Sequence, residues 1–313
     1  MFKSALALFA VFVALQLSVT GQARKPSGAT QASRSITVKT APGASVWIDS
    51  VLFGKAGEDG KLTINAVPAG NRTLRVRLKG SNEIKKPLSA VKGEITVPLT
   101  PATEPAELAF QEAEELTLSD RQKAIAAFEK AISLRPRFAE AYLGLARTLS
   151  EGGNLDKADK TIRALKKIRP RYAEASAVEG RIYKDWGDEP KAVAAFKRAI
   201  AEGGGFQPEA YTGLGLLYKE KAENAGSTGD YAEESANYAE SAKYLAAAVK
   251  QLASSADAPV VYQLLGLVYE RQQRFNDAIA VYEEFLRLFP DSTEATAVRS
   301  FITQIKKQLP ASQ

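Results

Sequence analysis

Residues 124–170 decide the fold, and they read AIAAFEKAISLRPRFAEAYLGLARTLSEGGNLDKADKTIRALKKIRP. The pattern A-x3-F-x2-A-x4-P, which begins at Ala124, returns 34 residues later as A-x3-I-x2-L-x4-P from Ala158. Apolar residues three and four positions apart give a helix one buried stripe, and proline ends a helix because its ring clashes with the preceding turn. The stretch therefore predicts pairs of helices that repeat every 34 residues.

Further copies of the pattern begin at Ala192 and Ala278. Before most copies stands a Tyr that is followed by Leu and then by a small residue, as in Tyr211 with Gly215 and Tyr262 with Gly266. Such a glycine lets the paired helix approach closely. Period and residue types together resemble the tetratricopeptide repeat (TPR), which implies an all-α TPR solenoid of stacked helix pairs.

Two repeats depart from the common pattern. The first carries Gln111 and Glu112 at positions that are normally apolar or small, and the fourth is longer than its neighbours. In the fourth we expect two elongated helices, joined by a turn at residues 226–229 and followed by a cap at Asp230. Asp291 and Glu294 have the spacing of a capping box, which predicts a final helix that covers the last repeat.

Residues 35–100 alternate polar and apolar side chains over short runs, with turns rich in Gly and Pro between them. This pattern predicts a small all-β sandwich with strands near residues 35–40, 46–48, 61–64, 72–79 and 94–99. The segment resembles the PEGA family through a Pro-Gly-Ala turn at 42–44, a Val-Trp-Ile-Asp strand at 46–49, Gly54, Ala69-Gly70 and Leu99. That resemblance implies a PEGA-like binding or spacer module without catalytic residues.

The amino terminus reads as a secretory signal peptide, with Lys3, an apolar run from Ala5 to Leu15, and small residues up to Ala23. We therefore expect an exported protein, periplasmic or extracellular, with no membrane span after signal removal; an uncleaved anchor is the alternative. The expected organisation is multidomain: signal peptide 1–23, flexible linker 24–34, β-sandwich 35–100, hinge 101–104, TPR array of about five repeats 105–290, and capping helix 291–309.

Composition narrows the function. The chain has no Cys and no His, which excludes disulfides, thiolate metal sites and Ser-His-Asp catalysis. We expect no metal, no cofactor and no enzymatic activity; a hydrolase that uses paired carboxylates is the open alternative. The net charge is +6, but residues 101–313 hold 28 Lys and Arg against 31 Asp and Glu. An exported chain with a net acidic array argues against nucleic acid as the partner.

The resemblance to TPR proteins implies a concave groove lined by the first helix of each repeat. The groove-facing positions of this sequence include a basic set, Arg147, Arg181, Lys184 and Lys219, and an acidic set, Glu140, Glu174 and Glu209. The basic set could pair with acidic groups or with the carboxyl terminus of an extended peptide. The alternative is that all of these are ordinary solvated helix charges.

A second candidate surface lies in the β region, where Arg75, Arg77 and Lys79 share one strand face. This basic face could meet an anionic polymer or an acidic partner, or it could be a solvated outer face. The sequence thus predicts a non-enzymatic protein-protein interaction scaffold of the bacterial cell envelope that binds a protein or extended peptide through the TPR surface. The alternative is a cell-wall or polysaccharide-binding protein that acts through the β domain.

Overall fold

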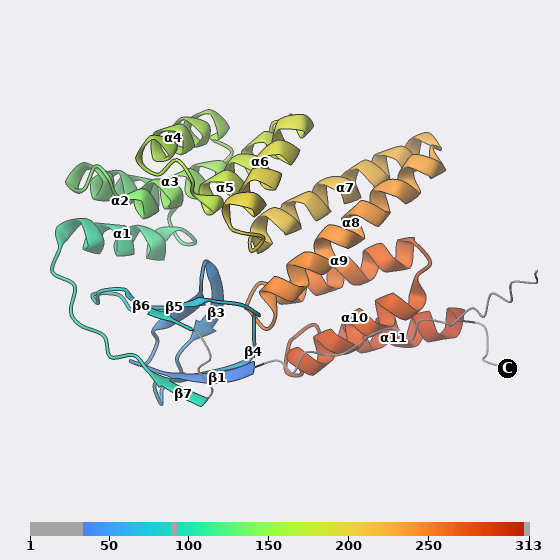
Figure 1. The fold of residues 1–313 in the computed structure, drawn as a ribbon, viewed down its shortest axis with the longest axis horizontal. Helices are drawn as coiled ribbons and strands as arrows, with labels where there is room; N and C mark the ends of the chain where they lie inside the picture. The colour runs from blue at the N-terminus through green and yellow to red at the C-terminus, as the bar shows by residue number, and fades with distance from the viewer. Residues whose placement is uncertain (1–33, 89–92, 310–313) are drawn as a thin grey trace, which may run out of the picture. The chain divides into compact units, whose positions relative to one another are not determined.

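The computed structural model describes residues 34–88 and 93–309 (Figure 1). The predicted signal peptide and almost all of the predicted linker lie outside the described residues. Strands fill the amino-terminal part of the described chain and helices fill the rest. A β region followed by a helical solenoid confirms the predicted fold class.

The strands form two sheets, ordered β4-β1-β7 and β3-β2-β5-β6. Only the pairing of β1 with β7 is parallel among the described strands. Alternate residues of both sheets, such as Val38, Ile48 and Val76, are fully buried and form one core between the sheets. The strand bounds are β1 Arg34–Lys39, β2 Ser45–Ile48, β3 Val51–Lys55, β4 Lys61–Val67, β5 Thr73–Arg77, β6 Ile84–Pro87 and β7 Gly93–Thr96.

Two of these strands, β3 and β6, are missing from the sequence prediction. Asp49 and Ser50 form a two-residue hairpin loop that leads directly from β2 into β3. Asp49 adopts a left-handed conformation with φ of 52°, and its carboxylate accepts a 2.9 Å hydrogen bond from the backbone N–H of Thr73. Strand β6 carries adjacent lysines, so its apolar alternation is too weak to be read from sequence.

The helices follow one another as antiparallel pairs along the chain (Figure 1). Helices α2, α4 and α10 each end two residues before Pro136, Pro170 and Pro290, as predicted. No described helix combines the length and the apolar character that crossing a membrane requires. The helix bounds are α1 Pro105–Leu116, α2 Arg121–Leu134, α3 Ala139–Glu151, α4 Leu155–Ile168, α5 Ala173–Asp185, α6 Glu189–Glu202, α7 Pro208–Thr228, α8 Tyr231–Leu252, α9 Ala258–Arg271, α10 Phe275–Leu288 and α11 Ala295–Gln308.

The predicted glycines do bring helices together. A Cβ atom at Gly215 would lie 2.6 Å from Leu245, and one at Gly266 would lie 2.3 Å from the ring of Tyr282. The same holds at Gly180, where a Cβ would lie 2.5 Å from Phe196. No side chain fits at these distances, so the close packing of helix pairs requires glycine there.

Two predicted helix ends are wrong in detail. The turn expected at residues 226–229 begins only at Gly229, whose left-handed conformation with φ of 80° ends α7, while residues 226–228 continue the helix. The cap at Asp230 forms as expected and accepts from the N–H of Glu233 at 2.9 Å. The last helix begins at Ala295, later than the capping-box spacing predicts, since the N–H of Glu294 bonds to the Ser292 hydroxyl instead.

Candidate functional site

The β module contacts the helical array at α1. Gln111 accepts from the backbone N–H of Gly80 at 2.8 Å and donates to the carbonyl of Ser81 at 2.9 Å. Arg77 forms an ion pair with Glu114, and its guanidinium lies 4.8 Å from the centre of the Phe110 ring. The polar residue that breaks the repeat pattern at position 111 is therefore a contact to the β module.

A second contact joins the β module to loops of the array. The N–H of Ala256, between α8 and α9, donates to the carbonyl of Leu52 at 3.1 Å. Ser254 accepts from the backbone N–H of Ala66 at 3.1 Å. Arg72 lies 3.7 Å above the ring of Phe206, in the loop before α7. The described β residues and the array thus meet in two places and belong to one compact unit.

These contacts change the meaning of the predicted basic face. Arg77 is only 8% exposed, Arg75 donates to Glu83 at 2.8 and 3.2 Å, and Lys79 lies 2.5 Å from Glu115. The carboxylate of Glu83, before β6, and two carboxylates of α1 therefore pair with Arg75, Arg77 and Lys79, of which Lys79 is 67% exposed.

Glu83 is the residue that the sequence prediction missed. Burial raises its pKa, but the hydrogen bond from Arg75 and the charges of Arg77, Arg75 and Lys85 outweigh burial and lower the pKa to about 2. It lies in the turn region before β6, where an isolated acidic residue gives no signal of its role.

The basic strand face and part of the acidic row line one hollow of about 150 Å³. Trp47, Arg75 and Arg77 line it from the β module, and Glu140 and Glu174 line it from the array. Glu140 also lies 3.8 Å from Arg169. Two surfaces that the sequence suggests as separate binding sites therefore face each other within the same molecule.

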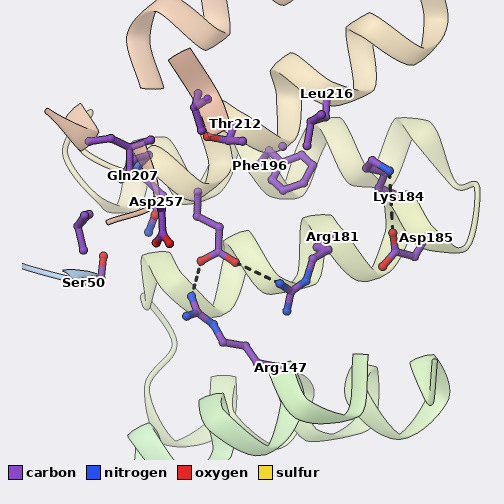
Figure 2. Close-up of a pocket in the computed structure, with 16 residues that line it drawn as sticks. Ser50, Arg147, Arg181, Lys184, Asp185, Phe196, Gln207, Thr212, Leu216 and Asp257 are labelled. Carbon is purple, nitrogen blue, oxygen red and sulfur yellow. Dashed lines mark hydrogen bonds and ion pairs between the residues drawn. The ribbon is translucent and has the colours of Figure 1, made fainter. Parts of the chain in front are cut away.

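A second cavity has a volume of about 430 Å³. It lies between helices α3, α5 and α7 of the array and the β2–β3 hairpin (Figure 2). Arg147 of α3, Arg181 of α5 and Lys184 of α5 enter it from one side. Phe196 and Leu216 give it an apolar wall. Ser50 and Val51 of the hairpin line the cavity from the β module. The remaining lining residues belong to the array, and they are Asp185, Gln207, Pro208, Glu209, Thr212, Gly213, Leu252, Asp257 and Val261.

Within this cavity the structure pairs the predicted basic and acidic sets with each other. Arg147 forms an ion pair with one carboxylate oxygen of Glu209, and Arg181 lies 4.0 Å from the other (dashed lines in Figure 2). Arg181 also lies 3.6 Å from Glu151. Burial lowers the pKa of Arg147, but the Glu209 carboxylate and other nearby anionic groups more than offset burial and raise it. Arg147 and Arg181 therefore face the same Glu209 carboxylate.

The two predicted lysines are held differently. Lys184 lines the cavity and lies 2.9 Å from Glu220, whereas Lys219 lies outside it and pairs with Glu223 of its own helix at 2.6 Å. The predicted basic strip therefore divides into a cluster of Arg147, Arg181 and Lys184 and a separate lysine. The division arises because α7 carries its own acidic residue one helical turn from Lys219.

Several donor nitrogens of Arg147 and Arg181 have no hydrogen-bond partner among the described residues. Among the described residues, the Nε of Arg147 and the Nε and Nη2 of Arg181 are buried and have no hydrogen-bond partner. Guanidinium groups bind carboxylates best through two parallel N–H bonds, and neither arginine achieves this with Glu209 alone. The hydrogen-bonding capacity of the two arginines is therefore incompletely used within the described part of the chain. Over the described part of the chain, no group of three or more Asp, Glu, His or Cys residues is arranged to hold a metal ion.

Comparisons with known proteins agree with the helical architecture. Two family models described as tetratricopeptide repeat match residues 116–182 and 259–299. No curated protein matches the chain.

Solved structures give the fold alone. Yeast Tom70 superposes with a TM-score of 0.51 at 18% identity, over 66% of this chain and 40% of that one. A thermophilic TPR protein of Thermus thermophilus gives 0.46 at 20% identity, over 64% and 99%. The Cut9–Hcn1 hetero-tetramer of the APC/C gives 0.49 at 16% identity, over 66% and 37%. The chain thus spans well under half the length of the Tom70 and Cut9–Hcn1 chains.

The PEGA resemblance of the β module remains a prediction. The array, in contrast, combines the repeat period, the glycine contacts at Gly215 and Gly266, the matched family models and the fold shared with Tom70. This chain contains tetratricopeptide repeats, and its helices form a TPR-like solenoid.

Proposed function

We propose that this protein is a non-enzymatic scaffold of the bacterial cell envelope that holds an extended segment of a partner protein in the cavity between α3, α5, α7 and the β2–β3 hairpin. Tetratricopeptide repeats support a protein-protein interaction scaffold as the general function. The observation that carries the finer proposal is the 430 Å³ cavity in which Arg147 and Arg181 face the apolar side chains of Phe196 and Leu216.

The lining suits a peptide. Apolar walls supply contact area, and a few convergent polar groups fix the orientation of a bound segment. Arginine N–H groups can bind either a carboxylate or the backbone carbonyls of an extended chain. The β2–β3 hairpin contributes Ser50 and Val51 to the same cavity, so a bound segment would touch both the array and the β module.

The envelope location rests on the sequence of residues 1–23, which has the charge, apolar run and small residues of a secretory signal. This sequence supports a role outside the cytoplasm, and fractionation of the native cell tests it directly.

The alternative of a glycan-binding β domain has less support. It depended on the basic face of Arg75, Arg77 and Lys79, and these side chains are engaged by Glu83, Glu114 and Glu115. An anionic polymer would have to displace three carboxylates to reach them. We therefore favour the cavity over the strand face as the binding surface.

Photo-crosslinking in the native cell tests the scaffold. A benzoylphenylalanine at Leu216 in the cavity should give discrete adducts in the envelope fraction, whereas the same probe at Lys130, exposed on α2, should not. The double substitution Arg147→Glu and Arg181→Glu should remove the Leu216 adducts, because it reverses the charge that the partner meets. Adducts that persist in the double variant, or that appear equally from both probe positions, would reject the cavity as the binding surface.

A further inference from the structure

The two helices of each of the first three repeats differ in charge. The second helices, α2, α4 and α6, hold 11 Lys and Arg against 5 Asp and Glu, whereas the first helices, α1, α3 and α5, hold 3 against 9. Side chains of the first helices line the 150 Å³ hollow against the β module, and Figure 1 shows each second helix farther from that module. Over these repeats the array therefore has an acidic inner wall and a basic outer wall.

The acidic inner wall is compensated within the molecule. Residues 35–100 hold 10 Lys and Arg against 5 Asp and Glu, and Arg77 and Lys79 pair with Glu114 and Glu115 of α1. The outer wall has no such compensation, since over the described residues no ion pair links α2, α4 or α6 to the β module. The uncompensated charge of these repeats is therefore basic and lies on their outer side.

Six cations of the outer wall are exposed and have no ion-pair partner in the described part of the chain. The same three helices expose two acidic residues, Glu129 and Asp156. Other cations turn inward, since Lys166 and Arg198 both pair with Glu179. The six exposed cations, which we call the basic outer strip, are Arg121, Lys130, Lys157, Lys160, Lys167 and Lys197.

The 34-residue period brings this outer wall into register across neighbouring repeats. Lys123, Lys157 and Lys191 occupy equivalent positions in α2, α4 and α6. In α2 and α6 the lysine at this position pairs with the aspartate that caps its helix, whereas α4 is preceded by Asn154, which carries no charge. The charge is therefore least neutralised on α4, in the middle of the strip, and the two neighbouring helices extend it.

We propose that the basic outer strip binds the anionic phospholipid headgroups of a membrane surface. Its charges are spread over three helices and do not converge on one point, and none of the six lines either cavity described above. Five of the six are lysines, whose compact hydrated charge is attracted to an anionic surface without the fixed bidentate geometry of arginine. An extended, lysine-rich wall therefore suits a plane of phosphates better than a single small anion.

The predicted location and the resulting orientation agree with this ligand. Residues 1–23 read as a secretory signal, so the predicted export route brings the chain to a membrane. With the outer wall of α2, α4 and α6 on the lipid, the cavity between α3, α5, α7 and the β2–β3 hairpin lies on the opposite side of the array. Membrane docking thus leaves the proposed partner site accessible, and it does not depend on a partner in that site.

Vesicle flotation tests the proposal with the chain after signal removal, because a signal peptide inserts into lipid on its own. The probe is large vesicles of phosphatidylglycerol and phosphatidylcholine at a ratio of about 1:2, compared with phosphatidylcholine alone. The wild type should float with the anionic vesicles only, and less of it should float as NaCl rises from about 0.05 to about 0.5 M. No flotation at low salt would overturn the proposal, and binding of dextran sulfate in its place would assign the strip to soluble polyanions.

The triple substitution Lys157→Gln, Lys160→Gln and Lys167→Gln removes the exposed lysines of α4. All three positions are exposed and glutamine is a good helix former, so the fold should be retained. Each lysine near an anionic membrane surface strengthens binding about fivefold, so partitioning into the anionic vesicles should fall at least about tenfold. Unchanged partitioning of the folded triple variant would contradict the proposal.

Lys55→Gln, Lys250→Gln and Lys307→Gln together form the matched control. These lysines are also exposed without an ion-pair partner in the described residues, but they lie on β3, α8 and α11. The control lowers the net charge by the same amount and should keep partitioning within about twofold of the wild type. An equal loss in both triple variants would show that net charge alone is responsible and would overturn the strip as the docking face.

A fluorophore on the outer wall gives a second readout that needs no lysine variant. The chain has no Cys, so Ala194→Cys on α6 and Ala239→Cys on α8, both exposed positions, can each carry a single nitrobenzoxadiazole label. Residue 194 lies one repeat after Lys160, so anionic vesicles should shift the emission of a label there to the blue and leave a label at 239 unchanged. Equal shifts at both positions, or none at 194, would overturn a defined docking face. Leu216 adducts in the cell report on the cavity instead, so the scaffold and the membrane face fail separately.

Discussion

At the scale of single residues, the array depends on positions where no side chain fits. A Cβ at Gly266 would lie 2.3 Å from the Tyr282 ring, whereas one at Gly226 would meet only the flexible end of Glu234. Gly266→Ala should therefore lower stability by about 1–3 kcal/mol through overpacking. Gly226→Ala, inside α7, should raise it by up to about 1 kcal/mol because alanine favours helix. Thermal melts of both variants check this, and similar effects in the two would contradict it.

Some contacts of single residues could be predicted from the sequence and others could not. The glycines at 215 and 266 could be predicted, because their neighbours in the repeat are close in sequence. Gln111 reads only as an irregular repeat position, since its partners Gly80 and Ser81 belong to another module. Glu209 reads as one member of an acidic row, and nothing local indicates that it lies between Arg147 and Arg181. Pairing across repeats depends on tertiary packing, which periodicity does not encode.

At the scale of elements, strands β5 and β6 are joined to α1 by a charge network around Glu83. The pKa of Glu83 lies near 2 in the folded protein, below the ordinary value of 4.5. A carboxyl whose pKa is lowered by folding stabilises the native state above its unfolded pKa, and that stability is lost as pH falls toward 2. Glu83→Gln should therefore destabilise the protein at pH 7 by on the order of 2–3 kcal/mol, and the deficit should shrink between pH 4.5 and 2.

Denaturant unfolding at a series of pH values measures this difference. Asp59→Asn is a suitable control, because Asp59 lies in an exposed turn and accepts only a local hydrogen bond from Lys61. A Glu83→Gln deficit that stays constant down to pH 2 would mean that the side chain acts through shape and not through charge.

At the scale of the whole molecule, the sequence predicts two successive modules but gives no sign that they dock. The fold class follows from local patterns, namely alternation in the strands and the 34-residue period in the helices. The docking follows from pairs such as Arg77 with Glu114 and Leu52 with Ala256, which are distant in sequence. Such complementarity is established only when both surfaces exist, so the composite cavity was beyond prediction.

The two tryptophans of the chain can test whether the modules unfold together. Trp47 lies in β2, and Trp186 follows α5 in the array. With one tryptophan replaced by Phe in each case, Trp186→Phe leaves a reporter of the β module and Trp47→Phe leaves a reporter of the array. Because the modules share buried contacts, both reporters should give the same melting temperature.

Adding Arg77→Ala and Gln111→Ala to each single-tryptophan chain removes two contacts to α1 and leaves the exposed pair of Lys79 with Glu115 in place. Each lost contact leaves buried partners unsatisfied, at a cost of about 1–3 kcal/mol to the docked state. The two melting temperatures should then move apart, because only the contacts of the β module to Ser254, Ala256 and Phe206 and the exposed Lys79 pair still couple the modules. Glu112→Ala, a change at an exposed neighbour of Gln111, should keep them together. Separate transitions already in the parent chains would mean that the β module moves independently of the array, and that Ser50 and Val51 do not close the cavity in solution.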